Sequence, residues 1–286
     1  MQNTILLTFD VEDWFQVENF KQYIPFSAWD SKELRVEKNT NELLDLLDSF
    51  SVPVHATFFI LGWIAQRCPK LVREIEQRGH EVASHGFGHH LCYNQSKNEL
   101  RDDLLRSKEL LEDLTGKQVA GYRAPSFSIT DDILTLVGEA GYLYDSSFNS
   151  YEGHGRYGAL SLPQNAKQDE PIYKITSSFY EIPVSNLRVG SRIIPWGGGG
   201  YFRLLPVFLH RAGVKRILEQ KKSYTFYLHP WEIDPGQPRV KEAKAFFRFR
   251  HYVNLHKTKQ KLKGFIESNN DKLFLRCKDF VIDAAQ

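Results

Sequence analysis

Short apolar runs alternate with longer amphipathic stretches along most of the chain. Residues 4–9, 54–60, 119–122 and 224–228 are rich in apolar, aromatic and β-branched side chains, and their lengths suit buried strands. Stretches such as 39–50 lie between them and carry leucines at helical spacing. Strands that alternate with helices predict a parallel sheet, and therefore an α/β fold.

Capping residues mark the ends of several expected helices. Asn39 is expected to cap the helix over 39–50. Ser96 and Glu99 form a capping box before a helix that Gly116 ends. Further helices are expected over 69–78, 130–140 and 204–220, and further strands over 80–83, 142–144, 180–184 and 273–281.

Length and composition favour one soluble-type α/β domain, which we expect to span residues 1–286. Lysine and arginine (37) nearly balance aspartate and glutamate (35), so the overall charge favours no nucleic-acid partner. Three cysteines without a paired short spacing indicate buried thiols in a reducing compartment, not disulfides. The sequence has no signal-peptide pattern and no apolar run long enough to span a bilayer, so we expect a cytoplasmic protein.

Residues that can carry chemistry follow the expected strands. The strand ends are marked by Asp10, Glu12, Asp13, His85, His89, Arg123, Asp145 and His229. The carboxyl ends of parallel strands meet at one edge of a sheet or barrel, and α/β enzymes place their sites there. We therefore expect these side chains to form a single site.

The composition of this expected site predicts metal-dependent hydrolysis. His85 and His89 are four residues apart and can bind one ion from the same side. Two histidines and a carboxylate with open positions describe a catalytic divalent site, with zinc first and cobalt, nickel, iron or manganese also compatible. A second carboxylate can take a proton from water, a histidine on the opposite side can protonate the departing group, and an arginine can orient the base.

Four motifs resemble those of the polysaccharide deacetylases (NodB homology, carbohydrate esterase family four). The likeness covers roughly residues 4–232 and implies a distorted, incomplete (β/α) barrel. The motifs are, in order, Thr8-Phe9-Asp10, His85-x-x-x-His89, Arg123-x-Pro125 and Leu228-His229-Pro230.

The resemblance implies a role for each strand-end residue. By this likeness Asp10 is the general base, Arg123 orients it, and His229 is the general acid. His85 and His89 are metal ligands by the same likeness.

The chain departs from the family pattern at the metal site. Glu12 and Asp13 stand where the family has adjacent aspartates, so either could be the carboxylate ligand; strand alternation favours Glu12. Gly86 replaces the usual serine or threonine, which removes a hydroxyl beside the site. His90 follows His89 and could compete with it as a ligand.

The substrate is expected to contact aromatic side chains, because these stack on sugar rings. The glycine run 197–200 suits either close approach of a sugar or a flexible hinge, and the polar stretch 148–172 suits a loop that faces the substrate. The resemblance adds that Leu228 lines the pocket for the acyl methyl group and that a backbone N–H near Phe127 binds the oxyanion. The expected substrate-binding residues are Phe127, Asp145, Trp196, Tyr201, Leu228 and Trp231.

The second half of the chain carries further signals. Segments 9–14, 198–203 and 249–255 look like the branch of the family associated with exopolysaccharide loci of the PEP-CTERM type, which implies exopolysaccharide synthesis. Residues 233–286 are expected to pack on the same barrel. Within them, segment 239–263 holds nine lysines or arginines against one acid, which suits a phosphate group, an anionic lipid surface, a glycan carrier or a solvated helix face.

We therefore expect a metal-dependent hydrolase that removes N-acetyl groups from amino sugars of a bacterial polysaccharide or its precursor. A precursor linked to a nucleotide or lipid, at the inner membrane face, fits the predicted cytoplasmic location best. Two alternatives remain open: hydrolysis of another amide, such as an N-formyl sugar or a cyclic ureide, and a carbohydrate-binding protein without activity. The sequence does not indicate an oligomeric state.

Overall fold

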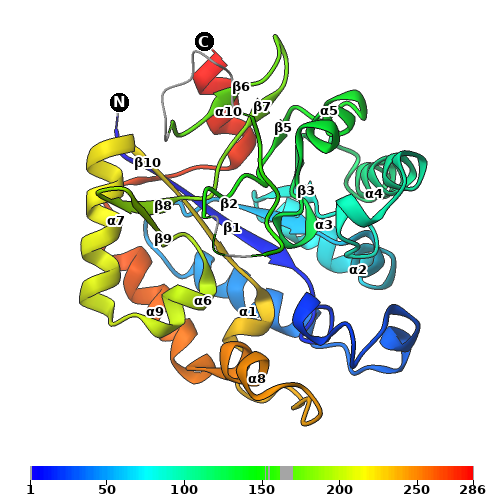
Figure 1. The fold of residues 1–286 in the computed structure, drawn as a ribbon. Helices are drawn as coiled ribbons and strands as arrows, with labels where there is room; N and C mark the ends of the chain where they lie inside the picture. Colours follow the sequence, from blue (N-terminus) through cyan, green and yellow to red (C-terminus); the bar gives the residue numbers. More distant parts are fainter. Residues whose placement is uncertain (1, 152, 154, 162–169, 286) are drawn as a thin grey trace.

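Strand β1 (Thr4–Val11) is buried along its whole length and lies within the main sheet. The computed structural model describes residues 2–151, 153, 155–161 and 170–285. Strand β1 pairs in parallel with β10 (Ser223–Leu228) and with β2 (Ala56–Ile60). Figure 1 shows the sheet crossing the molecule, with helices packed around it.

The main sheet is parallel except at one edge. Its order is β10-β1-β2-β3-β4-β5-β7-β6, with β11 added beside β1, and only β6 runs antiparallel to its neighbour. Within the described residues its two outer strands do not pair with each other, so the sheet is a curled half-barrel, and the predicted incomplete barrel is confirmed. The other strands are β3 (Glu81–Ser84), β4 (Gly121–Tyr122), β5 (Tyr144–Asp145), β6 (Tyr173–Lys174), β7 (Tyr180–Glu181), β8 (Asn186–Val189), β9 (Arg192–Pro195) and β11 (Leu273–Phe274).

Helices follow most strands and cover the sheet (Figure 1). Strands β8 and β9 form a separate hairpin. The helices are α1 (Val36–Asp48), α2 (Gly62–Arg67), α3 (Pro69–Gln77), α4 (Lys97–Thr115), α5 (Asp131–Glu139), α6 (Gly199–Leu204), α7 (Val207–Lys221), α8 (Ala245–Tyr252), α9 (Leu255–Glu267) and α10 (Cys277–Ala285).

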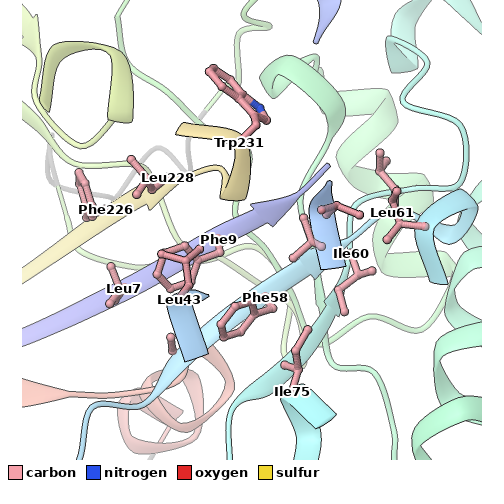
Figure 2. Close-up of a cluster of buried hydrophobic side chains, with 14 of the residues drawn as sticks. Leu7, Phe9, Leu43, Phe58, Ile60, Leu61, Ile75, Phe226, Leu228 and Trp231 are labelled. Atoms are coloured by element: carbon pink, nitrogen blue, oxygen red, sulfur yellow. The ribbon is translucent and has the colours of Figure 1, made fainter. Parts of the chain in front are cut away.

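Alternation along β1 separates the core from the site. Leu7 and Phe9 point to one face and pack with Leu43 of α1 and Phe58 of β2, and the rings of Phe9 and Phe58 stack 4.9 Å apart (Figure 2). Each such aromatic ring contributes about 1.5–3 kcal/mol when fully buried. Because successive strand residues point to opposite faces, Asp10 faces away from this core.

Helix α1 begins earlier than predicted, because a residue distant in sequence caps it. The Asp13 carboxylate accepts the backbone N–H groups of Arg35 (2.6 Å) and Val36 (2.9 Å). These are the groups at the start of the helix, four and three residues before the predicted cap Asn39. Asn39 lies inside the helix, buried, and its side-chain amide donates to Asp234 at 3.2 Å. The predicted cap is therefore wrong.

Two further boundaries differ from the prediction. The helix expected over 204–220 is α7, which begins only at Val207 after Pro206, and the short helix α6 (Gly199–Leu204) precedes it without having been predicted. The strand expected over 273–281 is only β11, and α10 follows it. Glu81 stabilises the start of α10 by accepting the N–H of Lys278 (3.0 Å). By contrast, the predicted capping box of α4 is confirmed, with Ser96 and Glu99 bonding each other's backbone.

The C-terminal segment is part of the same sheet, because β11 pairs with the first residues of β1. Cys68, Cys92 and Cys277 are buried and free, as the prediction of unpaired thiols required. Among the described residues, no helix combines the length and apolar character needed to cross a membrane.

Candidate active site

A cleft of about 480 Å³ lies where the strands end at their carboxyl edge. Side chains from three strand ends and from the loops after them line it. The predicted site residues in its lining are Asp10, Glu12, His85, His89, Phe127, Tyr201, His229 and Trp231. Sequence positions more than 200 residues apart are therefore brought together, as the strand-end pattern predicts.

Glu12, His85 and His89 form a group that can hold a metal ion. One nitrogen from each ring and a carboxylate oxygen lie within 4.8 Å of one another, and all three side chains are buried. Burial would raise the pKa of Glu12, but its electrostatic interactions with the rings of His89 and His229 lower it to about 2, so the carboxylate is ionised. Its Oε2 atom lies 3.0 Å from Nε2 of His89 and has no hydrogen-bond donor among the described residues.

The hydrogen bond of His85 prepares its ring for a cation. Nδ1 lies 2.7 Å from the carbonyl oxygen of Arg123, which can only accept, so Nδ1 carries the proton and Nε2 keeps its lone pair. Burial lowers the pKa of His85 to about 4, which keeps the ring neutral. A neutral imidazole, a second imidazole and an ionised carboxylate fit a divalent cation.

Asp13, the alternative carboxylate ligand, uses its oxygens to accept backbone N–H groups. Its two oxygens accept backbone N–H groups of Trp14 (2.8 Å), Arg35 and Val36, and it does not belong to the group of Glu12 and the two histidines. Burial raises the pKa of Asp13 to about 6, against the lowering effect of these N–H groups. The structure thus corrects the prediction for Asp13, whose role here is to cap a helix.

The loop that carries the two histidines is held by Asp103 of α4. Its Oδ1 accepts the N–H of Phe87 at 3.0 Å. Gly86 has φ +71°, a conformation that favours glycine, and a Cβ built there would lie 2.7 Å from Oδ1 of Asp103. His89 also has a positive φ, +53°, which is strained for a residue with a side chain. Glycine in place of the family's serine or threonine at position 86 therefore leaves room for the Asp103 carboxylate.

Replacing Gly86 with alanine is expected to destabilise the protein more than replacing Gly116. Gly116 ends α4 at φ +67° with nothing within 4 Å of a built Cβ, so G116A introduces only backbone strain, about 1–2 kcal/mol. G86A adds the displacement of Asp103 from its N–H partner, about 1–3 kcal/mol more. Chemical denaturation of both variants measures the difference, and equal losses would contradict this account of the loop.

Asp10 is held by Arg123, as the resemblance implied. Nη1 of Arg123 donates to Oδ1 of Asp10 and to Oγ1 of Thr8, both at 2.7 Å. The guanidinium is fully buried, and its other nitrogens donate to the carbonyl and hydroxyl of Ser146 at 2.9 Å. Oδ2 of Asp10 remains directed to the cleft, 3.9 Å from Nε2 of His229.

His229 is positioned by Glu232, a residue that the sequence analysis did not select. Nδ1 of His229 lies 2.8 Å from Oε1 of Glu232, and Nε2 lies 3.1 Å from Glu12. Burial opposes a charge on the ring, but Glu12 and Glu232 together raise the pKa of His229 to about 9. The ring is therefore protonated at neutral pH, and its Nε2–H faces the cleft beside Asp10.

Arg203 in turn holds Glu232. Its Nε donates to Oε2 of Glu232 at 2.7 Å, and both side chains are buried. Its remaining donors bind the carbonyls of Arg250, His251 and Val253, so α8 supports His229 through a buried ion pair. The spacing His229-x-x-Glu232 was visible in the sequence, but nothing local pointed to Arg203.

A family model described as "Polysaccharide deacetylase" matches residues 1–144, just over half of the 286-residue chain. The chain belongs to the polysaccharide deacetylase family. A second model, a domain of unknown function (DUF3473), matches residues 146–281. Within the chain the ligand group comes from the first matched part, and His229, Glu232 and Arg203 come from the second.

Curated relatives align with the chain over a limited stretch. The chain is 35% identical over 103 residues to the peptidoglycan-N-acetylglucosamine deacetylase of Bacillus cereus, which is 36% of this chain and 47% of that protein. It is 33% identical over 103 residues to the chitooligosaccharide deacetylase of Sinorhizobium fredii, with the same two shares. The chain thus spans less than half the length of these relatives.

Solved structures share the fold of this chain. A protein of the polysaccharide deacetylase type from Mycobacterium smegmatis superimposes with a TM-score of 0.65 at 22% identity, over 99% of this chain and 90% of that one. A pseudoenzyme of the CE4 family from Bacillus anthracis, BA3943, superimposes with a TM-score of 0.52 at 12% identity, over 98% and 66%. Because one of these is a pseudoenzyme, the fold alone does not show activity.

Three of the predicted substrate contacts lie outside the cleft lining. Leu228 is fully buried in the core beside Phe226 (Figure 2). Trp196 is buried and its indole N–H donates to the carbonyl of His210 at 3.0 Å. Asp145 is buried and accepts the hydroxyl and N–H of Ser147. The structure therefore corrects these three predictions: two side chains pack in the core and one supports a loop.

The other predicted contact residues line the cleft. Phe127 is among them, and its own backbone N–H donates to the carbonyl of Ala124 at 2.9 Å; an oxyanion-binding N–H near Phe127 stays a prediction. Trp231 lines the cleft and also stacks on His229, with ring centroids 5.1 Å apart. Tyr201 lines the cleft from α6.

Part of the glycine run packs against protein atoms. A Cβ at Gly199 would lie 2.2 Å from Oε1 of Glu232, and a Cβ at Gly198 would lie 2.6 Å from the hydroxyl of Tyr227. Gly200 has no atom within 4 Å of a built Cβ, and Gly198 and Gly200 line the cleft, so close approach of a sugar there stays a prediction. Of the stretch 148–172, residues 152, 154 and 162–169 lie outside the described part of the chain, while Asn149, Tyr151 and Arg156 line the cleft.

Proposed function

We propose that this chain removes an N-acetyl group from an amino sugar of a bacterial glycan or glycan precursor, releasing acetate and a free amine. One observation carries the proposal: Asp10, a proton acceptor, and His229, a proton donor, lie 3.9 Å apart beside Glu12, His85 and His89. The names of the aligned relatives, which are deacetylases of peptidoglycan and chitooligosaccharide, support it. We treat both matched parts as one catalytic domain, since each supplies residues to the cleft.

The residues divide the proton transfers between them. Glu12, His85 and His89 would hold a divalent ion, zinc first, which when bound supplies Lewis acidity toward an acyl oxygen and a water molecule. Asp10 accepts the proton of the attacking water at Oδ2, because Arg123 keeps Oδ1 engaged and holds the carboxylate in place. His229 donates its Nε2 proton to the departing amine nitrogen, which leaves as a neutral amine.

The Glu232→Gln variant is expected to move the alkaline limb of the rate profile to lower pH. A raised pKa keeps His229 protonated at neutral pH, and activity that needs this proton is lost as the pH rises through the pKa. Removing the charge of Glu232 lowers that pKa, so the loss begins earlier. Rate against pH for E232Q, with E242Q on the exposed surface as the matched control, measures the shift.

An unchanged alkaline limb in E232Q would contradict the role of Glu232 as the residue that positions and charges His229. A uniform loss of rate at all pH values, with the limb unmoved, would assign Glu232 a structural role only. Circular dichroism of E232Q checks that the fold survives the loss of the Arg203 pair.

Mass spectrometry of acetylated glycans before and after incubation with the zinc-loaded protein tests the proposed reaction. Loss of acetyl groups with stoichiometric acetate is the expected result. Release of formate from N-formyl sugars, or opening of a cyclic ureide, without acetate release would favour the alternative amide substrates. Zinc binding with no hydrolysis of any of these would make the chain a carbohydrate-binding protein.

We further propose that the substrate is a precursor in exopolysaccharide synthesis that carries an anionic nucleotide or lipid pyrophosphate. Arg156 and Arg250 line the cleft that also contains Asp10 and Glu12. The two arginines suit a carrier that bears phosphate groups. A comparison of turnover on a free and a pyrophosphate-linked amino sugar tests this choice. A preference for the free sugar would contradict it.

A further inference from the structure

Large apolar side chains are exposed on two segments beside the cleft. One segment runs from the end of α6 into α7, and the other is α8. Among their side chains Phe208 is 76% exposed and Phe246 is 63% exposed. We call this set the apolar rim: Leu204, Val207, Phe208, Leu209, Phe246 and Phe249.

The two segments of the apolar rim are joined to one another. Arg203 of α6 binds three carbonyls at the end of α8, and the side-chain amide of Asn254 donates back to the carbonyl of Arg203 at 3.0 Å. Lys261 of α9 also donates to the carbonyl of Leu205, between α6 and α7. In Figure 1, α6, α8 and α9 accordingly lie together on one side of the molecule.

The apolar rim borders the cleft. Leu204, Phe246 and Phe249 belong to the cleft lining, next to Tyr201 and Arg250. Any surface that covers the rim therefore meets the opening through which a substrate reaches Asp10 and His229.

Unpaired cations accompany the apolar rim. Lys241, Lys244 and Arg248 are exposed, and within the described residues no carboxylate lies within 4.0 Å of their charged nitrogens. Glu242 is the acid nearest in sequence. Two lysines of segment 239–263 on α9 do pair, Lys259 with Glu42 at 3.0 Å and Lys263 with Glu267 at 3.9 Å, whereas Lys241, Lys244 and Arg248 lie in α8 or directly before it.

We propose that the apolar rim and the cations Lys241, Lys244 and Arg248 dock on the surface of an anionic lipid bilayer, with the cleft opening against it. Phenylalanine and leucine insert at the boundary between headgroups and acyl chains, while lysine and arginine reach the headgroup phosphates. A protein partner fits less well, because protein interfaces are depleted in lysine. Where it implies a lipid-linked substrate, this inference rests on the proposed function; the docking itself does not.

Vesicle co-sedimentation of the full chain tests the docking without using its activity. The probes are phosphatidylcholine vesicles with and without phosphatidylglycerol, at low and at high salt. The variants are K241E/K244E and F208S, neither of which changes a residue of the cleft lining. The matched controls are K70E/R73E on exposed positions of α3 and I282S on α10, where Ile282 is 48% exposed.

Wild type is expected to sediment with the anionic vesicles at low salt and to be released by high salt. K241E/K244E should weaken partitioning by about tenfold or more, since each basic residue near the surface contributes about 1 kcal/mol. F208S should weaken it as well, and both controls should match wild type.

Three outcomes would overturn the proposal. Wild type could stay in the supernatant with anionic vesicles at low salt, or it could bind neutral and anionic vesicles equally. The control variants could also lose as much vesicle binding as K241E/K244E and F208S. If the rim variants keep vesicle binding but lose turnover of a soluble oligosaccharide, the rim contacts glycan and the docking proposal fails. Absence of hydrolysis by wild type would count against the proposed function alone.

Discussion

Replacing Asp10 with asparagine is expected to lower kcat for deacetylation by about 10²–10⁴-fold, the usual contribution of a general base. Asparagine keeps the shape of the side chain and an oxygen that can accept the Arg123 bond, which in the native protein measures 2.7 Å. It cannot take a proton from water. The loss should therefore fall on kcat, measured by acetate release at saturating substrate.

The matched control for D10N is Thr8→Val. Thr8 accepts from the same Arg123 nitrogen, also at 2.7 Å, so T8V disturbs the arginine without removing a proton acceptor. Its kcat should fall far less than that of D10N. Zinc content and thermal unfolding of both variants show whether the site and fold survive, because breaking a buried ion pair costs about 3–5 kcal/mol. Near-native turnover by D10N would mean that the base lies elsewhere.

Replacing His85 with alanine is expected to remove both activity and the stabilisation that a divalent ion gives. A ligand at about 1,000 times its Kd stabilises the folded state by about 4 kcal/mol, and H85A should lose this effect. The control is H90A. His90 is outside the group of Glu12, His85 and His89, and its ring packs on Phe26 with centroids 5.5 Å apart.

Thermal unfolding with zinc and with a chelator measures the difference between these variants. Wild type and H90A should unfold at a higher temperature in zinc, and H85A should not respond. A zinc response in H85A that is absent from H90A would make His90 the ligand and would contradict the assignment.

Much of the site was predictable because it follows from strand periodicity. Asp10 is the last residue but one of β1, and His85 and His229 come directly after β3 and β10; parallel strands carry such residues to one edge. The choice of Glu12 over Asp13 followed from the same alternation. The curled, incomplete barrel came from the motif resemblance and not from the pattern itself.

What the sequence did not reveal depends on contacts between distant segments. Asp13 caps α1 across 22 residues, a contact that no local capping pattern encodes. Arg203 reaches Glu232 and three carbonyls near α8, and only the folded chain brings these groups together. Trp196 was expected to contact substrate because it flanks the glycine run, and Leu228 because of the family resemblance, but both side chains are buried in the core.

The central claim is that Glu12, with His85 and His89, forms the site of one divalent ion. Calorimetric zinc titration of wild type, E12Q and D13N tests it most directly. Asp13 already accepts three backbone N–H groups, so D13N should lose some stability and still bind one zinc ion with near-native affinity. E12Q should bind zinc at least about tenfold more weakly than wild type. Full zinc affinity in E12Q together with its loss in D13N would contradict the account.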